Sequence, residues 1–451
     1  MQGPETVEQC LYTGRPACDS VQSDGIRPSR RTSRTTWQAI SDVRWSANAS
    51  ALTAAKMRTD FSAAVTVLLS LLTLICIAAE SGSASAEDFQ VTSPPQSLRS
   101  GSNGAEVPVD PLYKKFISAN GYPILASKRV DDYALKEAAY LVDTMLANRP
   151  DVRQAMIESG SRMLVFAHNE FTTDLPEYSG FTPKDYWDRR SRGFGGSLQD
   201  PVCSVAEENL LGFAGDPYKT ECILIHEFAH NIHLRGLVHI DETFDRRLRE
   251  AYDSSLGQGL WKGKYAAVNH YEYWAEGVQS WFSNNRQPDH DHNHVDTREE
   301  LIEYDSRLAQ LCREVFGDTK LVYSKPATRL VGHMKGYDPA QAPTFVWPQR
   351  LKEIQLNLEL KWTPAAGIKA PNSVLSKTET WVMFRNQSAA AVKIGWVDFD
   401  GEFQMYKKLR PRGDFAQQTF AGHTWMVTDT DGKSLGYFVA SPAIAHATVP
   451  R

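Results

Sequence analysis

The chain has 451 residues, of which 42% are hydrophobic and 23% are charged, and these proportions are those of an ordinary globular protein. A chain of this length has room for two or three domains. The net charge of −5 argues against a nucleic-acid-binding surface, so no nucleic acid is expected among the partners.

The N-terminal part carries a pattern typical of an export signal. Lys56-Met57-Arg58 precedes an apolar run over residues 63–79, and the small residues up to Ala86 offer a cleavage site. The pattern predicts a signal peptide or signal anchor over residues 57–86. Residues 1–56 are then an unstructured extension or a start placed too early. The protein is expected to be secreted or periplasmic, and the alternative is a single-pass membrane anchor through the apolar run.

Residues 87–109 are rich in Ser, Gly and Pro, which predicts a flexible leader. Three cysteines remain after the predicted cleavage, namely Cys203, Cys222 and Cys312. An exported protein can form one disulfide among them, although the sequence does not choose the pair. Their spacing does not fit a cysteine zinc site.

The most informative motif of the chain is HEFAH, at residues 226–230. Asp216-Pro217 is typical of an N-cap followed by proline in the first turn, and Gly236 is typical of a C-terminal stop, so a helix is predicted between them. Two histidines four residues apart lie on one helix face, where both can bind one Zn²⁺. The alternative is a core helix with two ordinary histidines.

A second helix is predicted over residues 269–282, because aromatic and apolar residues recur there at helical spacing. Glu272 and Glu276 share one face of this helix. One carboxylate can complete a site for a single zinc ion while the other holds a ligand histidine. The alternative is an aromatic core helix with two solvated glutamates.

HEFAH followed by EYWAE resembles the gluzincin peptidases, in particular the catalytic domain of anthrax lethal factor and its relatives. The resemblance implies an α+β zincin-like metallopeptidase domain over residues 110–350. It implies that His226, His230 and Glu272 bind zinc, that Glu276 orients a ligand histidine, and that Glu227 and Tyr265 are catalytic. Glu227 would act as general base and later acid, and Tyr265 would stabilise the oxyanion.

The same resemblance implies a sheet edge that binds the substrate backbone in extended form. Residues 162–170 have the pattern of a strand with an apolar centre, and they are the candidate for this edge. The alternative is a plain buried strand. A separate loop, residues 287–296, contains His290, His292 and His294, and it is interpreted as an exposed loop rather than a surface metal site.

After a linker at residues 351–373, residues 374–446 predict a small all-β sandwich domain. Short segments rich in β-branched and aromatic residues alternate with turn signals. Asp400-Gly401 and Asp431-Gly432 are expected at hairpin turns.

This β segment resembles the β domain of the von Hippel–Lindau tumour suppressor family. The matching text is FRNQS, WVDFDGEFQMYKKLRPRG and TFAGHTWMVTD. In that family the corresponding pocket reads hydroxyproline, and Thr419 stands where the family has serine. Gln418 and Phe420 also depart from the family pattern. The elongin-recruiting helix has no counterpart, so no elongin-type partner is expected. The pocket positions are Trp396, Tyr406, Thr419, His423 and Trp425.

These features predict an exported zinc-dependent endopeptidase whose β domain binds hydroxyproline-containing or other peptide substrate. The alternative is a non-catalytic peptide-binding protein with a degenerate peptidase domain. The partner in either case is a protein or peptide, and the predicted cofactor of the enzyme is one Zn²⁺ ion.

Overall fold

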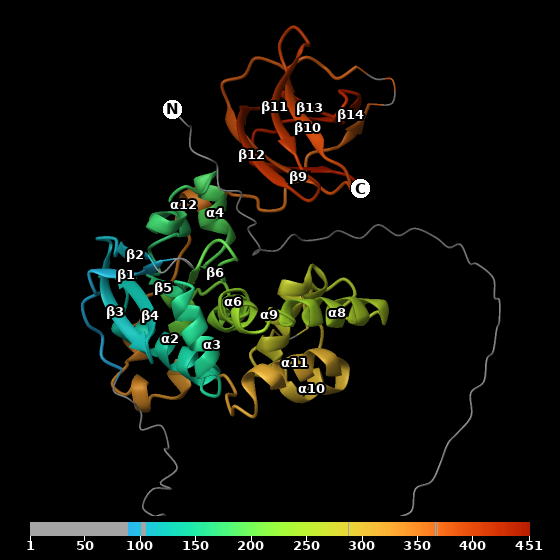
Figure 1. Cartoon of the computed structure of the whole chain (residues 1–451). Helices are drawn as coiled ribbons and strands as arrows, with labels where there is room; N and C mark the ends of the chain where they lie inside the picture. The colour runs from blue at the N-terminus through green and yellow to red at the C-terminus, as the bar shows by residue number, and fades with distance from the viewer. Residues whose placement is uncertain (1–88, 101–104, 287, 366, 368) are drawn as a thin grey trace, which may run out of the picture. The chain divides into compact units, whose positions relative to one another are not determined.

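A mixed helix-and-sheet region is followed by an all-β region, as the sequence predicted (Figure 1). The predicted extension, the signal peptide and the alternative membrane anchor all lie outside the described residues. Among the described residues, no helix has the length and apolar character that crossing a membrane requires. The computed structural model describes residues 89–100, 105–286, 288–365, 367 and 369–451.

A mixed five-stranded sheet forms the centre of the first region. Its order is β3-β4-β5-β7-β6, with β4, β5 and β7 parallel and the two outer strands antiparallel to their neighbours. Every residue of β4 and β7 is buried, as is typical of parallel strands covered on both faces. The strands are β3 (Tyr113–Ala119), β4 (Tyr122–Ser127), β5 (Arg162–Phe166), β6 (Gly193–Phe194) and β7 (Val202–Ala206).

Successive side chains of the strands point to opposite faces of this sheet. Met163 belongs to a large core that also contains residues of α2 (Asp132–Met145) and α6 (Ile223–Asn231). The next residue, Leu164, belongs to a second core with residues of α4 (Lys184–Arg190). The sheet is therefore covered by helices on both faces.

The predicted leader is not wholly irregular. Its described residues include a two-stranded antiparallel sheet of β1 (Ser97–Ser100) and β2 (Ala105–Pro108). The prediction missed it because the segment is polar overall, but Leu98 and Val109 are partly buried against the core that contains α4.

The helix that carries HEFAH begins at Ile223, so the predicted start at Asp216-Pro217 was wrong. The Asp216 carboxylate accepts a hydrogen bond from the Tyr218 N–H at 2.8 Å and closes a local turn instead. The N–H of Ile223 donates to Oδ1 of Asn209, also at 2.8 Å. A distant asparagine thus satisfies a free N–H at the start of α6.

Gly236 does not end this helix, contrary to the prediction. After α6 the chain continues through a π-helical turn, η3 (Ile232–Leu237), into α7 (Val238–Ile240). A Cβ on Gly236 would lie 2.6 Å from Cγ1 of Val152. Glycine is required there because α3 (Pro150–Glu158) packs closely against η3.

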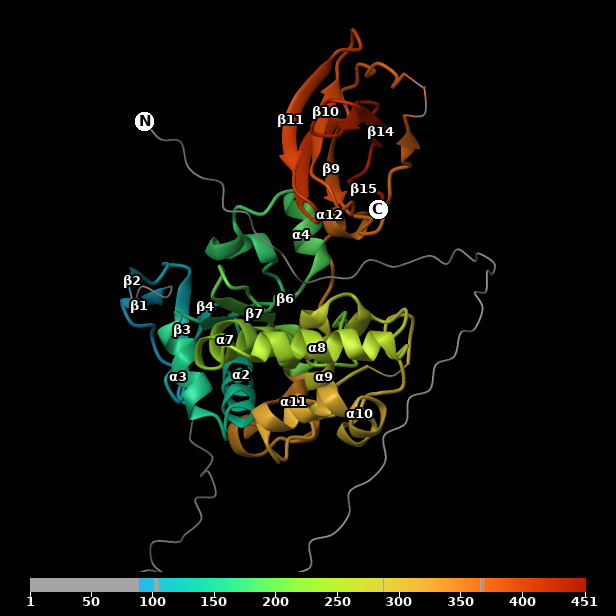
Figure 2. The same ribbon diagram turned by 45° about the vertical axis from the view of Figure 1, so that its right-hand side comes forward.

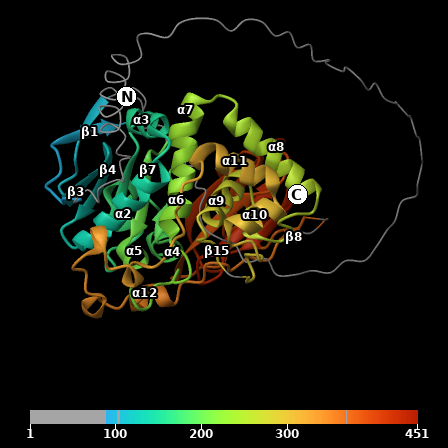
Figure 3. The ribbon, with the colours of Figure 1, turned by 90° about the horizontal axis from the view of Figure 1, so that it is seen from below.

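The second predicted helix is confirmed as α9 (His270–Trp281), which packs against α6 (Figure 1). Helices α8, α10 and α11 surround α9 (Figures 2 and 3). A Cβ on Gly277 would lie 2.5 Å from Cδ2 of Leu308, so glycine allows α11 to approach α9. The remaining helices of this region are α5 (Glu207–Leu211), α8 (Phe244–Gly257), α10 (Arg298–Tyr304), α11 (Ser306–Phe316) and α12 (Gln349–Lys352).

The sequence left room for one disulfide, but none forms among the described cysteines. Cys203, Cys222 and Cys312 are all buried free thiols. They lie in β7, directly before α6 and in α11, so each is part of the packing of a different element. Burial raises the pKa of Cys222 to about 11, which makes this thiol unreactive at neutral pH.

The all-β region contains two sheets, with strand orders β11-β10-β13-β14-β8 and β12-β9-β15. Phe384, Ile394 and Phe438 share its core. Both predicted hairpin turns are confirmed, with Gly401 at φ 91° and Gly432 at φ 92°. The strands are β8 (Thr363–Pro364), β9 (Glu379–Asn386), β10 (Val392–Val397), β11 (Phe403–Leu409), β12 (Asp414–Phe420), β13 (Thr424–Thr428), β14 (Ser434–Val439) and β15 (Ala445–Val449).

This region extends beyond the predicted bounds of residues 374–446. The predicted linker contributes β8, and the Leu360 N–H donates to the carbonyl of His446 at 2.7 Å. At the other end β15 continues to Val449. The sequence analysis missed these parts because residues 364–371 are rich in Pro, Ala and Gly, although Leu358, Leu360 and Trp362 before them pack in or against the β core.

Candidate metal centre and candidate peptide pocket

Three predicted metal ligands converge where α6 packs against α9. His226 and His230 project from one face of α6, with 3.2 Å between their Nε2 atoms. Oε2 of Glu272 lies 3.1 Å from Nε2 of His226 and 3.4 Å from Nε2 of His230. All three side chains are buried, and their ligand atoms lie within 4.8 Å of one another. Two imidazoles and a carboxylate in this arrangement suit one zinc ion.

The first turn of α9 aims Glu272 at the histidines. Oδ1 of Asn269 accepts hydrogen bonds from the N–H groups of Tyr271 and Glu272 at 2.8 and 3.0 Å, and it caps the helix. Farther along, the indole of Trp274 donates to the carbonyl of Ala229 at 2.9 Å. This bond ties α9 to the backbone of α6 between the two motif histidines.

The charges of the ligand set are strongly coupled. Burial alone would lower the pKa of His226, but the hydrogen bond and negative charge of Glu272 raise it to about 10. Burial alone would raise the pKa of the Glu272 carboxyl, but the charges and hydrogen bonds of His230 and His226 hold this pKa well below its usual value. His226 and Glu272 therefore form an ion pair at neutral pH when no metal competes.

Glu227 is suited to proton transfer beside this group. Its side chain is buried, and no described residue hydrogen-bonds its Oε2. Burial raises the pKa of Glu227 to about 8, because the carboxylate has lost its solvation. A carboxyl with such a pKa can both accept and release a proton near neutrality.

Tyr265 lies in a short helical turn, η4 (Tyr265–Ala267), that packs on α9. Its ring centroid is 6.1 Å from that of His226. The Tyr265 N–H donates to the carbonyl of Asp291 at 2.8 Å. Asp291, in the histidine-rich loop, thus holds the backbone that presents this tyrosine.

Glu276 lies near His226, as predicted, but a glutamine lies closer. Oε1 of Glu276 is 3.6 Å from Nδ1 of His226, whereas Oε1 of Gln279 is only 2.8 Å from the same atom. Glu276 accepts a hydrogen bond from Nδ2 of Asn285 at 3.1 Å. Sequence reasoning missed Gln279, although its position seven residues after Glu272 places it two turns along the same helix face.

The histidine-rich loop was only partly interpreted correctly. His290 and His294 are exposed, as expected, but His292 is 3% exposed. Its Nδ1 lies 2.8 Å from Asp289, and its Nε2 lies 3.5 Å from Glu276. His292 is buried because the loop folds back over α9, and no spacing in the sequence signals this.

The strand that the sequence suggested as a substrate-binding edge does not lie at an edge of the sheet, and the alternative of a plain buried strand is confirmed. Residues 162–170 contain β5, which pairs with β4 on one side and β7 on the other, so it has no free edge. Strands β7 and β6 both pack against α6, and of these two β6 lies at the end of the sheet. A Cβ on Gly195, which follows β6, would lie 2.5 Å from the Cβ of His230. Glycine therefore brings this edge into contact with the HEFAH helix.

Four of the five predicted pocket residues of the β region lie on β10, β11, β12 and β13, and the fifth, His423, lies in the turn before β13. The rings of Trp396 and His423 stack with centroids 5.3 Å apart. Tyr406, which is 49% exposed, packs edge-on against Trp425 at 5.0 Å. Aromatic walls with an exposed rim can hold a small ring such as pyrrolidine.

Polar atoms lie between these rings. The Thr419 hydroxyl accepts a hydrogen bond from the indole of Trp425 at 3.1 Å and lies 3.2 Å from Nδ1 of His423. Burial lowers the pKa of His423, so its imidazole is neutral at pH 7. No described residue pairs with the buried indole N–H of Trp396. The pocket thus has donors and acceptors for a hydroxylated ligand.

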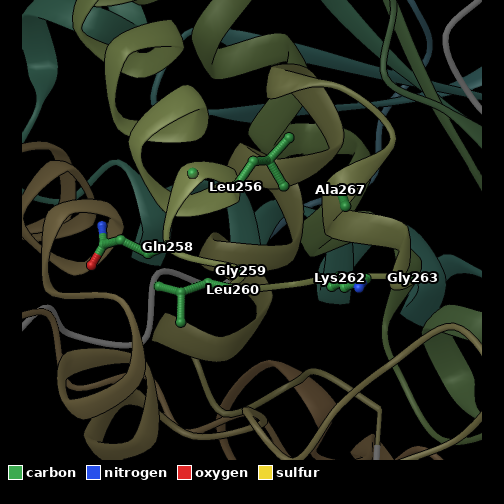
Figure 4. A pocket seen from close by; sticks show the side chains of 8 residues that line it. Leu256, Gln258, Gly259, Leu260, Lys262, Gly263 and Ala267 are labelled. Carbon is green, nitrogen blue, oxygen red and sulfur yellow. The ribbon is translucent and has the colours of Figure 1, made fainter. Parts of the chain in front are cut away.

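A separate cavity of about 600 Å³ lies beside the loop that leads to Tyr265 (Figure 4). Leu256, Leu260, Lys262 and Ala267 are among its lining residues. None of the predicted metal ligands belongs to its walls. We assign it no role in the site.

The comparison with protein families supports one part of this arrangement. Residues 372–437 match the family model described as the VHL beta domain. The match runs from before β9 into β14 and includes all five pocket positions. No curated protein matched the chain. The C-terminal region is therefore similar to a VHL beta domain.

Proposed function

We propose that the chain is an exported zinc-dependent endopeptidase with a C-terminal domain that binds its peptide substrate. The observation that carries the proposal is the convergence of His226, His230 and Glu272, with the buried Glu227 beside them, whose Oε2 has no hydrogen-bond partner in the part of the chain that the structure describes. Two histidines and a glutamate are a ligand set of catalytic zinc, which leaves a coordination position for water or substrate. Export is proposed from the sequence of residues 57–86.

The residues around the ligand group suit peptide hydrolysis. Bound zinc would supply Lewis acidity and lower the pKa of a coordinated water. Glu227 would accept the proton of the attacking water and deliver it to the leaving amine. The phenol of Tyr265 would donate a hydrogen bond to the oxygen on which negative charge develops. The zincin-like fold that the sequence motifs imply fits a mixed sheet beside the HEFAH helix.

The edge of the sheet next to the site supports an extended substrate. Among the described strands β6 pairs only with β7, and Gly195 lets the adjoining chain lie against Glu227 and His230. An extended peptide can pair with such an edge through its main chain, so the scissile bond would lie beside the ligand group.

We further propose that the β region binds hydroxyproline-containing peptide. Thr419 and His423 offer hydrogen bonds to a 4-hydroxyl group, and Trp396 and Tyr406 supply aromatic walls. The similarity of residues 372–437 to the VHL beta domain supports this choice.

The proposal is tested on the chain from residue 87 onward, purified without metal and titrated with zinc. We expect one zinc per chain and zinc-dependent hydrolysis of casein or a collagen peptide. Glu227→Gln is the matched control, because it keeps the ligands but removes the proton acceptor. It should retain zinc and lose hydrolysis by several orders of magnitude. Equal hydrolysis by this variant would exclude the mechanism. Zinc binding without any hydrolysis would favour a non-catalytic peptide-binding protein.

A further inference from the structure

A chain of hydrogen bonds leads to Nδ1 of His226, the ring nitrogen opposite the one that faces the other ligands. Arg286 donates from Nε to Oε1 of Glu221 at 2.8 Å. Gln279 donates from Nε2 to Oε2 of Glu221, also at 2.8 Å. Oε1 of Gln279 then lies 2.8 Å from Nδ1 of His226. Glu221 is 5% exposed and Gln279 is fully buried, so water does not replace these partners.

The polarity of this chain follows from the donors and acceptors that each group has. A carboxylate only accepts hydrogen bonds, so Gln279 must turn its amide nitrogen toward Glu221. The carbonyl oxygen of the same amide then faces His226, and that ring must donate from Nδ1. With a proton fixed on Nδ1, the nitrogen left to bind the metal is Nε2, which faces His230 and Glu272 and gives up its own proton when zinc binds.

We infer that Glu221 and Gln279 are positioning residues that fix His226 in the orientation and tautomer needed to bind the metal. The inference rests on the proposed function, since it concerns a ligand of the proposed zinc site. A partner that fixes the second nitrogen of a ligand histidine strengthens metal binding, and its loss weakens affinity by roughly 10 to 100-fold.

The inference explains why residue 221 must be a carboxylate. Arg286 and Gln279 both donate to it, one to each oxygen. A glutamine at 221 has one acceptor oxygen and one amide nitrogen, so it cannot accept from both neighbours in the same way. If the amide nitrogen of the new glutamine faces Gln279, the amide group of Gln279 must rotate by half a turn. The nitrogen of Gln279 then faces His226. The histidine must then accept at Nδ1, and its Nε2 carries the proton.

A pair of variants tests this polarity through zinc affinity measured by chelator competition. Glu221→Gln should weaken zinc binding by roughly 10 to 100-fold, although residue 221 does not touch the ligand histidine. The double variant Glu221→Gln with Gln279→Glu should restore the affinity. In it, Arg286 donates to the glutamine oxygen, the glutamine nitrogen donates to the new carboxylate, and that carboxylate still accepts from His226.

Thermal unfolding of each metal-free variant separates the inference from a general loss of stability. A merely structural role predicts that affinity follows stability in both variants and that the exchange gives no rescue. Unchanged affinity in Glu221→Gln, or a double variant no better than the single one, would overturn the relay while leaving the zinc site intact. A wild-type chain that binds no zinc would overturn both the relay and the proposed function.

Discussion

Glu272 and His226 face each other across the contact between α6 and α9, with 3.1 Å between Oε2 and Nε2, although 46 residues separate them in sequence. His230, one turn farther along α6, completes the group. Neither helix alone can bring three ligands together, so the metal site depends on how closely the two helices pack. Gly277 and Trp274 help to set the position of α9, through contacts with Leu308 and Ala229.

The two glutamates of α9 should differ in their effect on zinc. Glu272→Ala removes a ligand and should abolish zinc binding, as should His226→Ala or His230→Ala. Glu276→Ala should weaken binding by roughly 10 to 100-fold, because Glu276 lies 3.6 Å from His226 and would act on the metal through that ligand. Zinc content after dialysis measures the difference. The reverse order of effects would mean that the ligand lies one turn later on the helix.

Zinc binding should release protons at neutral pH. In the metal-free chain the pKa of His226 is raised to about 10 by Glu272, so this imidazole carries an extra proton at pH 7. A metal ligand must be neutral imidazole, and the proton therefore leaves when zinc binds. The affinity should accordingly rise with pH through the neutral range, by up to about tenfold per unit.

Calorimetry in two buffers with different ionisation enthalpies measures this release. We expect at least about one proton per zinc at pH 7 from His226. Heat that does not depend on the buffer would mean that His226 is already neutral, and that the ion pair with Glu272 does not form in solution.

Much of the metal site could be predicted from sequence because it depends on helix periodicity. The spacing of His226 and His230 fixes their common face on a helix whatever surrounds it. The start of that helix could not be predicted in the same way. Asp216 has the local chemistry of an N-cap, but a turn at Tyr218 uses it, and Asn209 caps α6 from a distance.

The missed contacts all depend on tertiary packing. Gln279 faces His226 only because Glu221, which precedes α6, fixes its amide. His292 is buried only because its loop folds onto α9 beside Glu276. The sequence analysis chose β5 rather than β6 as the candidate edge strand. The two residues of β6, one of them glycine, are too few to show an apolar pattern, whereas β5 has five residues and an apolar centre.

Adding one methyl group next to the HEFAH helix should disturb the site. A Cβ on Gly195 would lie 2.5 Å from the Cβ of His230 and 2.8 Å from the carbonyl oxygen of Glu227. The carbonyl oxygen belongs to the α6 backbone and the Cβ is attached directly to it, so neither atom can rotate out of the way. The chain at Gly195 must therefore move away from α6. Gly195→Ala should lower the free energy of unfolding by about 1–3 kcal/mol, as overpacking does, and should weaken zinc binding.

Gly257→Ala is the matched control. A Cβ there has no heavy atom within 4 Å, and the residue ends α8. It should leave zinc affinity unchanged and the stability equal or slightly higher, because alanine favours the helix. Chemical denaturation of both variants, with and without zinc, measures the effects. Equal behaviour of the two variants would show that the sheet edge is not held against α6.

The β-domain pocket should distinguish hydroxyproline from proline. We expect the chain carrying Glu227→Gln, which cannot digest its ligand, to bind a 4-hydroxyproline peptide at least several-fold more tightly than its proline twin. An unpaired buried donor or acceptor costs about 1–3 kcal/mol, and the proline peptide leaves the pocket hydrogen bonds unmade. Thr419 contacts both His423 and Trp425, and His423 stacks on Trp396, so both polar side chains should contribute to the preference.

Two substitutions at one position separate the hydroxyl group from the shape of the pocket. Thr419→Ser keeps the hydroxyl that pairs with Trp425 and should keep the preference, whereas Thr419→Val keeps the volume but removes the hydroxyl and should erase it. His423→Ala should erase the preference as well, without changing the zinc content of the chain. Calorimetric titration with the two peptides measures each case. Equal binding of both peptides by the Glu227→Gln chain would leave the domain as a general peptide-binding or structural module, because the polar atoms of the pocket would then contribute nothing to its choice of ligand.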